Sequence, residues 1–446
     1  MRQKDLDLGR TSVSRLFFEY LFPTLLSMMF SAILNVADGA FVGHGVGSDA
    51  LAAVNVAAPV FMFATGMGLM LGGGASVLGA VSLSRGENAK AGRLASGAFF
   101  ATVVTGIVIA TAVLTLPRQL CFIFGGSDVL LPYVTDYLRW ISLGMLCYGP
   151  MVAGMFLIRL DGSPRYAMLT NVIPSILNIA LDYLFVYPLQ WGIAGAAWAT
   201  SISAAIGALL ATVYFVFFSK NFRLSLPPLG TRHLRKQTFT DICQMSQSGF
   251  PALIGDIAIS FMLVVGNYMF INVLGEDGVA AFSVACYLTP MIFMFANSIA
   301  QSSMPIVSFN YGCGQTERVA KTLRLGISVA VISGVAICAL FSFFANGMAA
   351  IFLDTSTRAY ELACRGLPLF ALAFPFLTIN IVLIGYLQSV ERSKPASVFM
   401  TLRGFVFIFA FSQILPPLMG ESGLWLTVAA AEVSTLLVIW VSRKVG

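Results

Sequence analysis

Charged residues are scarce in this 446-residue sequence. Asp, Glu, Lys and Arg together make up 10% of the chain, whereas a soluble globular domain carries about 25%. Hydrophobic residues make up 58%. A chain with so few polar side chains cannot cover its own surface in water, so the composition excludes a soluble domain and predicts an integral membrane protein.

Residues that build catalytic and metal centres are equally rare. The sequence has 2 histidines, His44 and His233, and no HExxH pattern. Its 7 cysteines show no CxxC spacing, which indicates apolar packing rather than a disulfide framework or a metal centre. No GxxxxGK motif followed by Ser or Thr occurs, so a P-loop for ATP is absent from the sequence. We therefore expect a protein that is not an enzyme and needs no cofactor.

Long apolar runs occupy most of the chain. Twelve of them are long enough to cross about 30 Å of hydrocarbon as helices. We predict these spans at 14–42, 50–80, 95–117, 133–158, 166–187, 193–218, 243–273, 279–309, 322–346, 359–389, 396–417 and 424–441. Only residues 219–240, with two adjacent prolines and five basic residues, have the composition of a linker. The predicted fold is an all-α membrane protein with an N-terminal six-helix lobe (1–218), a cytoplasmic linker (219–240) and a C-terminal six-helix lobe (241–446).

The basic residues are divided unequally between the two sides of these spans. If the N-terminus is cytoplasmic, 22 of the 26 Lys and Arg residues lie on the cytoplasmic side. The four outside are Arg118, Arg139, Arg358 and Arg365. Cytoplasmic loops carry such an excess, so we predict a multi-pass protein of the cell (inner) membrane with both termini in the cytoplasm. The net charge of +6 then reflects contact with membrane lipid, not with nucleic acid.

The two halves of the chain repeat each other. Residues 22–30 (FPTLLSMMF) align with 250–258 (FPALIGDIA), and 45–57 (GVGSDALAAVNVA) align with 273–285 (VLGEDGVAAFSVA), both at an offset of 228 residues. The same offset pairs Gly195 with Gly423, so it holds over most of a lobe. Two related six-helix lobes are typical of transporters that bind their substrate between repeats.

Two acids interrupt otherwise apolar spans. Asp182 is the only charged residue between Tyr166 and Ser219. A charge inside the bilayer costs roughly 2.5–3.5 kcal/mol on insertion scales, so an acid there is by default a candidate for function. Asn178 comes one helical turn earlier and lies on the same helix face. Asp38 is likewise the only charged residue between Glu19 and His44.

The acids belong to a set of oxygen-bearing side chains in the first lobe. The set is Asp38, Asn178, Asp182 and Thr200. Carboxylate, amide and hydroxyl oxygens are the ligands that a small hard cation such as Na⁺ prefers. Two carboxyl groups close together would equally let one of them carry a proton near neutral pH. The pattern leaves both ions open, and the four residues are metal ligands only if the ion is Na⁺. The alternative is an Asp182 with a purely structural role, satisfied by neighbouring hydroxyls.

Several stretches together resemble the multidrug and toxic compound extrusion (MATE) family, in its bacterial DinF-like and MepA-like branch. They are VADGAFVGHGVGSDALAAVNVA, LSRGENAKAGR, LIRLDGSPRYAM, LNIALDYLFVYPLQWGIAGAAWAT and SFNYGCGQTERV. The resemblance covers essentially the whole chain. It implies two pseudo-symmetric six-helix lobes and the export of cationic or amphipathic small molecules in exchange for Na⁺ or H⁺ by alternating access. We expect a monomer.

The resemblance also implies roles for particular residues. The family's first-lobe cation site corresponds to Asp38, Asn178, Asp182 and Thr200, and its helix-bending proline corresponds to Pro23.

The second lobe departs from the pattern. Family members with a second-lobe acid carry a glutamate farther from the helix proline than Asp256, which follows Pro251 by only five residues. Asp256 is therefore either a cavity-lining or a structural acid, and a cation site in this lobe is doubtful. Glu432 is a further candidate for a second-lobe acid, although a structural pairing with Arg403 is the favoured interpretation.

Two alternative functions remain open at this point. A lipid-linked saccharide flippase of the same superfamily would be expected to have cavity arginines for phosphate and often additional helices. A non-transporting membrane receptor or scaffold is the second alternative, and the duplicated halves argue against it.

Overall fold

The computed structural model describes residues 7–124, 126–221 and 232–445. Within these ranges all regular elements are helices. The elements are α1 (Val13–Gly45), α2 (Ser48–Ser84), α3 (Asn88–Thr115), α4 (Pro117–Ile123), α5 (Leu131–Leu160), α6 (Pro164–Val186), α7 (Gly192–Val213), η1 (Tyr214–Phe218), α8 (Arg232–Gly312), α9 (Thr316–Phe343), α10 (Ala345–Phe352), α11 (Arg358–Ala371), α12 (Phe374–Ser389), α13 (Ser393–Thr401), η2 (Leu402–Val406), α14 (Phe407–Met419) and α15 (Glu421–Val445).

The apolar runs form the long helices that the sequence predicts. In the described residues, 10 helices are long and apolar enough to cross a membrane, and the bent pair α11 and α12 makes up to 11. The longest, α8, has 81 residues and would extend about 120 Å at 1.5 Å per residue, far more than a bilayer requires. A break at Gly275 (φ 70°, ψ −156°) divides it into two spans. The protein is thus a multi-pass, all-α membrane protein.

Three local features lie beyond the predicted pattern. The short helices α4 and α10 connect longer ones, and each is too short for hydropathy to mark it as a span. The pair α11 and α12 bends by 42°, and α12 begins at Phe374 with Pro375 in its first turn. The π-helical turn η2 interrupts the span that contains Arg403. These features arise from proline positions and local hydrogen bonding, which a hydropathy window averages away.

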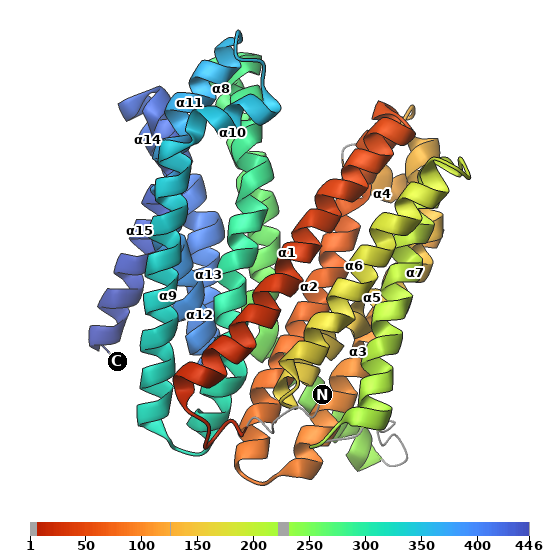
Figure 1. The fold of residues 1–446 in the computed structure, drawn as a ribbon, viewed down its shortest axis with the longest axis vertical. Coiled ribbons are helices and arrows are strands. Elements are labelled where there is room, and N and C mark those ends of the chain that lie inside the picture. The colour runs from red at the N-terminus through yellow and green to blue at the C-terminus, as the bar shows by residue number, and fades with distance from the viewer. Residues whose placement is uncertain (1–6, 125, 222–231, 446) are drawn as a thin grey trace. The chain divides into compact units, whose positions relative to one another are not determined.

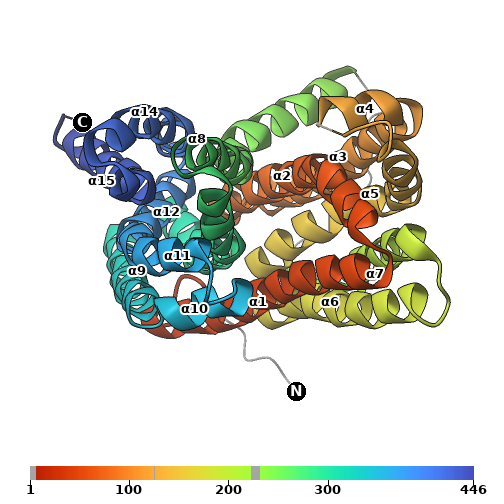
Figure 2. The ribbon, with the colours of Figure 1, turned by 90° about the horizontal axis from the view of Figure 1, so that it is seen from above.

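The chain packs as two compact units, each described by itself. Unit 1 comprises the described part of residues 1–253 together with Ser308–Thr316. In unit 1, α5 packs against α2, α3 and α7, and α1 lies along α6 (Figures 1 and 2). Glycine allows one close approach, because a Cβ on Gly249 of α8 would overlap the backbone carbonyl of Met70 on α2. Small residues permit such backbone contact between membrane helices.

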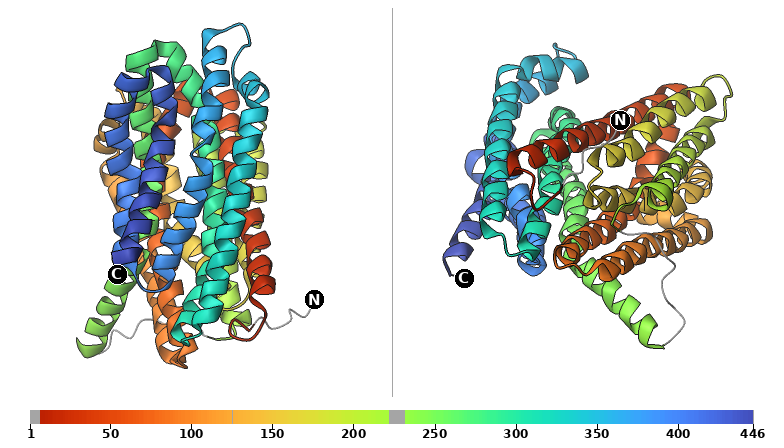
Figure 3. Two further views of the ribbon diagram at one scale, coloured as in Figure 1. Left: turned by 90° about the vertical axis from the view of Figure 1, so that its left-hand side faces the viewer. Right: turned by 60° about the horizontal axis from the view of Figure 1, so that its bottom comes forward.

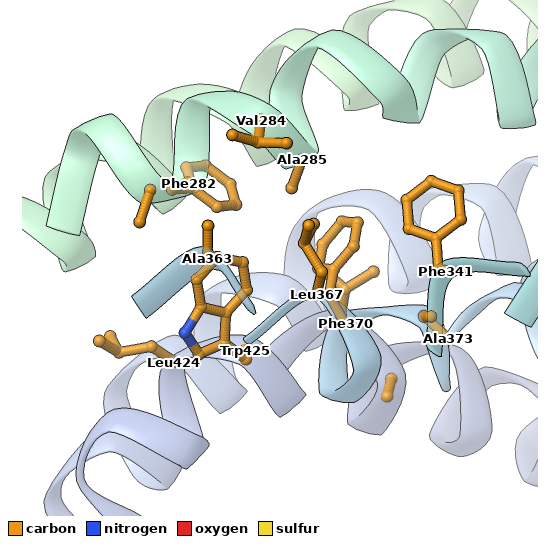
Figure 4. Close-up of a cluster of buried hydrophobic side chains, with 14 of the residues drawn as sticks. Phe282, Val284, Ala285, Phe341, Ala363, Leu367, Phe370, Ala373, Leu424 and Trp425 are labelled. Carbon is orange, nitrogen blue, oxygen red and sulfur yellow. The ribbon is translucent and has the colours of Figure 1, made fainter. Parts of the chain in front are cut away.

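Unit 2 comprises Ile254–Val307 and the described part of 317–446. Its largest apolar cluster gathers side chains of α8, α9, α11 and α15 around Trp425, which is 1% exposed (Figure 4). The rings of Phe270 and Phe282 stack with centroids 4.5 Å apart, and Phe270 meets Trp425 edge-on at 4.8 Å. Gly366 lies directly against the Trp425 ring, which leaves no room for a side chain there. These ring contacts form the centre of the apolar core of unit 2.

The predicted lobe boundaries at 218 and 241 remain a prediction. Helix α8 begins at Arg232, inside the stretch predicted as a linker, and residues 222–231 lie outside the described part of the chain. α8 supplies residues to both units. Within each unit the long helices run in roughly a common direction (Figure 3). Polar side chains on neighbouring helices can therefore contact each other where they lie at the same height along the helix axes.

Candidate ion-binding site in unit 1

Helix α6 carries a polar face into the interior of unit 1. The helix begins at Pro164, whose fixed φ suits the first helical position. Asn178 and Asp182, four residues apart, are 1% and 0% exposed. The other faces carry exposed apolar side chains such as Ile176 and Tyr183. The sequence therefore forms a helix with lipid-compatible sides and a single buried polar stripe.

The acids of α1 and α6 meet at this stripe. The side chains of Asp38 and Asp182 lie within hydrogen-bonding reach of each other. A hydrogen bond between two carboxyl groups needs a proton on one of them, because ionised carboxylates only accept. Among the described residues neither acid takes part in an ion pair. The charge balance of this pair therefore depends on a proton or a small cation.

Asn178 links the acid pair to α7. With its amide nitrogen facing α6's acid, Nδ2 donates to Asp182 Oδ2 at 2.9 Å. Oδ1 then accepts from the backbone N–H of Thr200 at 3.1 Å and from its hydroxyl at 3.3 Å. The opposite orientation would leave the amide oxygen facing only acceptors. The structure thus brings all four predicted site residues together, from α1, α6 and α7.

The site retains oxygen atoms that no protein group satisfies. Oδ1 of Asp38 and Oδ1 of Asp182 are both buried and have no hydrogen-bond partner. A buried carboxylate oxygen without a partner is unfavourable, and a proton or a coordinated cation would remove the deficit. The donor set of carboxylate, amide and hydroxyl oxygens suits Na⁺ as well as H⁺. No group of three or more His, Cys, Asp or Glu residues suited to a metal occurs in the described ranges.

Tyr137 of α5 is a neighbour that the sequence pattern does not reveal. Its side chain is 7% exposed and interacts electrostatically with both Asp38 and Asp182. Tyrosine is common near the ends of membrane helices, so its position in the sequence carries no specific signal. Only the packing of α5 within unit 1 brings its phenol within electrostatic range of the two acids.

The remaining predicted residues lie outside this cluster. Pro23 is inside α1, fifteen residues before Asp38, and α1 continues through it as one helix. Asp256 lies on the part of α8 that belongs to unit 2 and is half-buried. Its neighbour Gly255 packs against Met400 and Phe293. Asp256 is therefore described with unit 2 and not with the acid pair of unit 1.

Glu432 forms the ion pair with Arg403 that was favoured from the sequence. Arg403 Nε lies 2.7 Å from Glu432 Oε1, and the side chains are 7% and 3% exposed. Asn380 Nδ2 donates to Glu432 Oε2 at 2.8 Å. Arg403 counts with the cytoplasmic basic residues in the sequence, but the structure shows it buried in unit 2. A helix-interior arginine is drawn inward when an acid on a neighbouring helix compensates its charge.

A multi-pass helical fold with acidic side chains inside its apolar helices is typical of membrane transporters. The MatE family model matches residues 23–184 and 251–414. The chain therefore belongs to the MatE family of membrane transporters. The two matched segments begin at Pro23 and Pro251, which are separated by the 228-residue offset of the sequence repeat.

Curated relatives and solved structures agree with this assignment. The chain is 22% identical to the multidrug export protein MepA of Staphylococcus aureus, over 97% of this chain and 95% of that protein. The chain is 23% identical to MepA of Staphylococcus haemolyticus, over 97% of this chain and 93% of that protein. A multidrug resistance MATE family transporter in an outward-facing conformation has the same fold, with a TM-score of 0.90, 22% identity and coverage of 100% and 98%. The structure of a MOP superfamily transporter from Pyrococcus furiosus is similar with a TM-score of 0.89 and 22% sequence identity. The match covers 100% of this chain and 98% of that chain.

Proposed function

We propose that this protein is a secondary multidrug antiporter that exports cationic or amphipathic compounds in exchange for Na⁺ or H⁺. The observation that carries the proposal is the Asp38–Asp182 pair, in which each acid has one buried oxygen without a hydrogen-bond partner. Such a pair can bind a small cation or share a proton. The relatives named as multidrug export proteins match nearly the full length of the chain and support the substrate class.

Coupling follows from the position of the pair between two helices. With a proton or Na⁺ bound, Asp38 and Asp182 hold α1 against α6. Without it, two like charges at this distance repel, and the ion-free state favours separation of the helices. Pro23 removes one hydrogen bond of the α1 ladder, so bending is easiest there. The ion thus binds the two conformations with different affinity, which is the requirement for driving alternating access.

Orientation and location belong to the same proposal. The excess of basic residues supports cytoplasmic termini and a place in the cell (inner) membrane. A cationic substrate would be attracted by the same carboxylates once the coupling ion leaves. Competition of this kind, direct or through the conformational equilibrium, lets one ion enter as one drug molecule leaves. We propose that the monomer carries out this cycle.

The test is ethidium efflux from proteoliposomes under separately imposed Na⁺ and pH gradients. We expect efflux with one gradient, and its loss in Asp38→Asn and Asp182→Asn variants that still insert into the membrane. Asp49→Asn, which changes an exposed acid at the start of α2, is the matched control and should transport normally. Normal efflux by both site variants would refute the site. Absence of efflux by the unmodified protein under either gradient would refute the antiport and favour a lipid-linked substrate.

A further inference from the structure

The buried polar face of α6 extends well beyond the acid pair. Asn171, Ser175, Asn178 and Asp182 follow one another at spacings of four, three and four residues. On an α-helix these spacings place all four side chains on one face, one turn apart. Asn171 and Asp182 are separated by eleven residues, or about 16 Å along the axis, which is half the thickness of the hydrocarbon core.

Helix α1 supplies a matching row of polar side chains. Ser31 precedes Asp38 by seven residues, and Ser27 precedes Ser31 by four, so all three share a face. Ser31 Oγ donates to Asn171 Oδ1 at 3.0 Å. Because Ser31 meets Asn171 and Asp38 meets Asp182, the two helices run parallel and their polar rows face each other.

Asn171 joins the polar rows of the two helices by hydrogen bonds. Ser175 Oγ donates to the same Asn171 Oδ1, at 3.2 Å. The amide oxygen of Asn171 therefore accepts one hydrogen bond from Ser31 of α1 and one from Ser175 of its own helix. Hydroxyl and amide groups can exchange the roles of donor and acceptor by rotation. A single hydrogen bond of this kind would be enough to link the two helices. Ser31 and Asn171 are half-buried, and Ser175 is buried.

The row points toward the end of unit 1 at which α5 ends and α6 begins. There Tyr20 of α1 donates from its hydroxyl to the backbone carbonyl of Arg159, at 3.0 Å. Asp161 accepts from the Tyr214 hydroxyl at 2.7 Å and from the backbone N–H of Lys220 at 2.8 Å. The basic residues at this end make it the cytoplasmic side in the proposed orientation.

We propose that the polar rows of α1 and α6 form the route by which the coupling ion leaves Asp38 and Asp182 toward the cytoplasm, with Asn171 as an intermediate oxygen site. This inference rests on the antiport proposed above. The ligand class is a monovalent cation held by neutral oxygens, either Na⁺ or a proton carried by water. Ser31, Ser175 and Asn171 supply successive oxygens, so an ion moves between partners without entering bare hydrocarbon.

The route is tested by replacing Asn171 with a side chain of similar size that has no oxygen. In proteoliposomes, Asn171→Leu should slow gradient-driven ethidium efflux by about tenfold, since each ion loses a partner during release. Equilibrium Na⁺ or H⁺ binding to the acid pair should stay within about twofold of the unmodified protein, since the two carboxyl groups remain. Asn171→Ser keeps an oxygen and should retain most of the rate. Thr170→Val is the matched control, because the Thr170 hydroxyl donates to a carbonyl of its own helix, Ala167 O, at 2.7 Å.

The two ions are distinguished by running the efflux assay separately under a Na⁺ gradient and under a pH gradient, with the pH-driven assay repeated in heavy water. An enlarged solvent isotope effect in Asn171→Leu would identify proton transfer along the row. A normal rate in Asn171→Leu would overturn the route. Equilibrium binding lost as fully as in Asp182→Asn would also overturn it, because Asn171 would then belong to the binding site. Failure of the antiport itself is recognised separately, as absent efflux in the unmodified protein.

Discussion

Arg403 Nε donates to Glu432 Oε2 at 2.9 Å and lies 2.7 Å from Oε1, so one guanidinium neutralises the buried acid of unit 2. Asp38 and Asp182 of unit 1 have no such ion pair among the described residues. The repeat assigns residues without oxygen-bearing side chains to the positions equivalent to the four site residues. These equivalents are Gly266, Val406, Ala410 and Val428. The positions of unit 2 that are equivalent to the site therefore carry no acid, whereas those of unit 1 carry two.

Removing the acid of this ion pair should destabilise the protein strongly. Glu432→Gln leaves the Arg403 charge buried without a counter-charge, a loss of about 3–5 kcal/mol in the free energy of unfolding. The double variant Arg403→Met/Glu432→Leu removes both charges and should recover most of that loss. Thermal unfolding in detergent measures both effects. Single and double variants of equal stability would show that the pair is not coupled.

The amide of Asn178 should tune ion affinity rather than create it. Asn178→Ala removes the link between Asp182 and Thr200 but keeps both carboxyl groups. We expect the ion concentration for half-maximal efflux to rise roughly tenfold, with the maximal rate preserved, as for residues that orient a ligand. Thr200→Ser keeps the hydroxyl and serves as the matched control. An unchanged ion dependence in Asn178→Ala would contradict this role.

The approach of α2 and α8 in unit 1 should tolerate no side chain at Gly249. A methyl group there overlaps the Met70 carbonyl, and backbone cannot yield as a flexible side chain does. Gly249→Ala should therefore lower stability by about 1–3 kcal/mol. The control is Gly97→Ala on α3, where a new Cβ would lie 3.5 Å from the nearest atom, Met245 Cε. Equal melting temperatures of the two variants would argue against the close contact.

The turn between α10 and α11 should respond to acid. Hydrogen bonds from the Ser356 backbone N–H and hydroxyl, at 2.9 and 2.8 Å, lower the pKa of Asp354. A pKa lowered on folding adds stability above the unfolded-state value, and this is lost as the pH falls through the folded-state value. The amide protection factor of Ser356 should thus stay constant down to about pH 4 and then decrease. In Asp354→Asn, the protection should not change with pH in this range.

The candidate site was accessible to sequence reasoning because its members are chemically conspicuous. Asp182 stands alone in a long uncharged stretch, and Asn178 follows from helical spacing. Tyr137 and Asn171 could not be recognised from the sequence, since neither residue type is unusual in a membrane helix. Their importance depends on which residues of α1 face them. The pairing of Glu432 with Arg403 lay between these cases, because the sequence indicates two opposite charges but not their distance.

The membrane class, the long helices, the internal repeat and the isolated acids all follow from the order of the residues along the chain. Each of these is a local or periodic property, so hydropathy and spacing suffice to recognise it. The tertiary structure alone decided the rotation of each helix about its axis and the choice of its neighbours. These depend on side chains from distant segments fitting together, as at Met70 and Gly249. That fit brings Asp38 of α1 to Asp182 of α6 and leaves an oxygen of each without a partner.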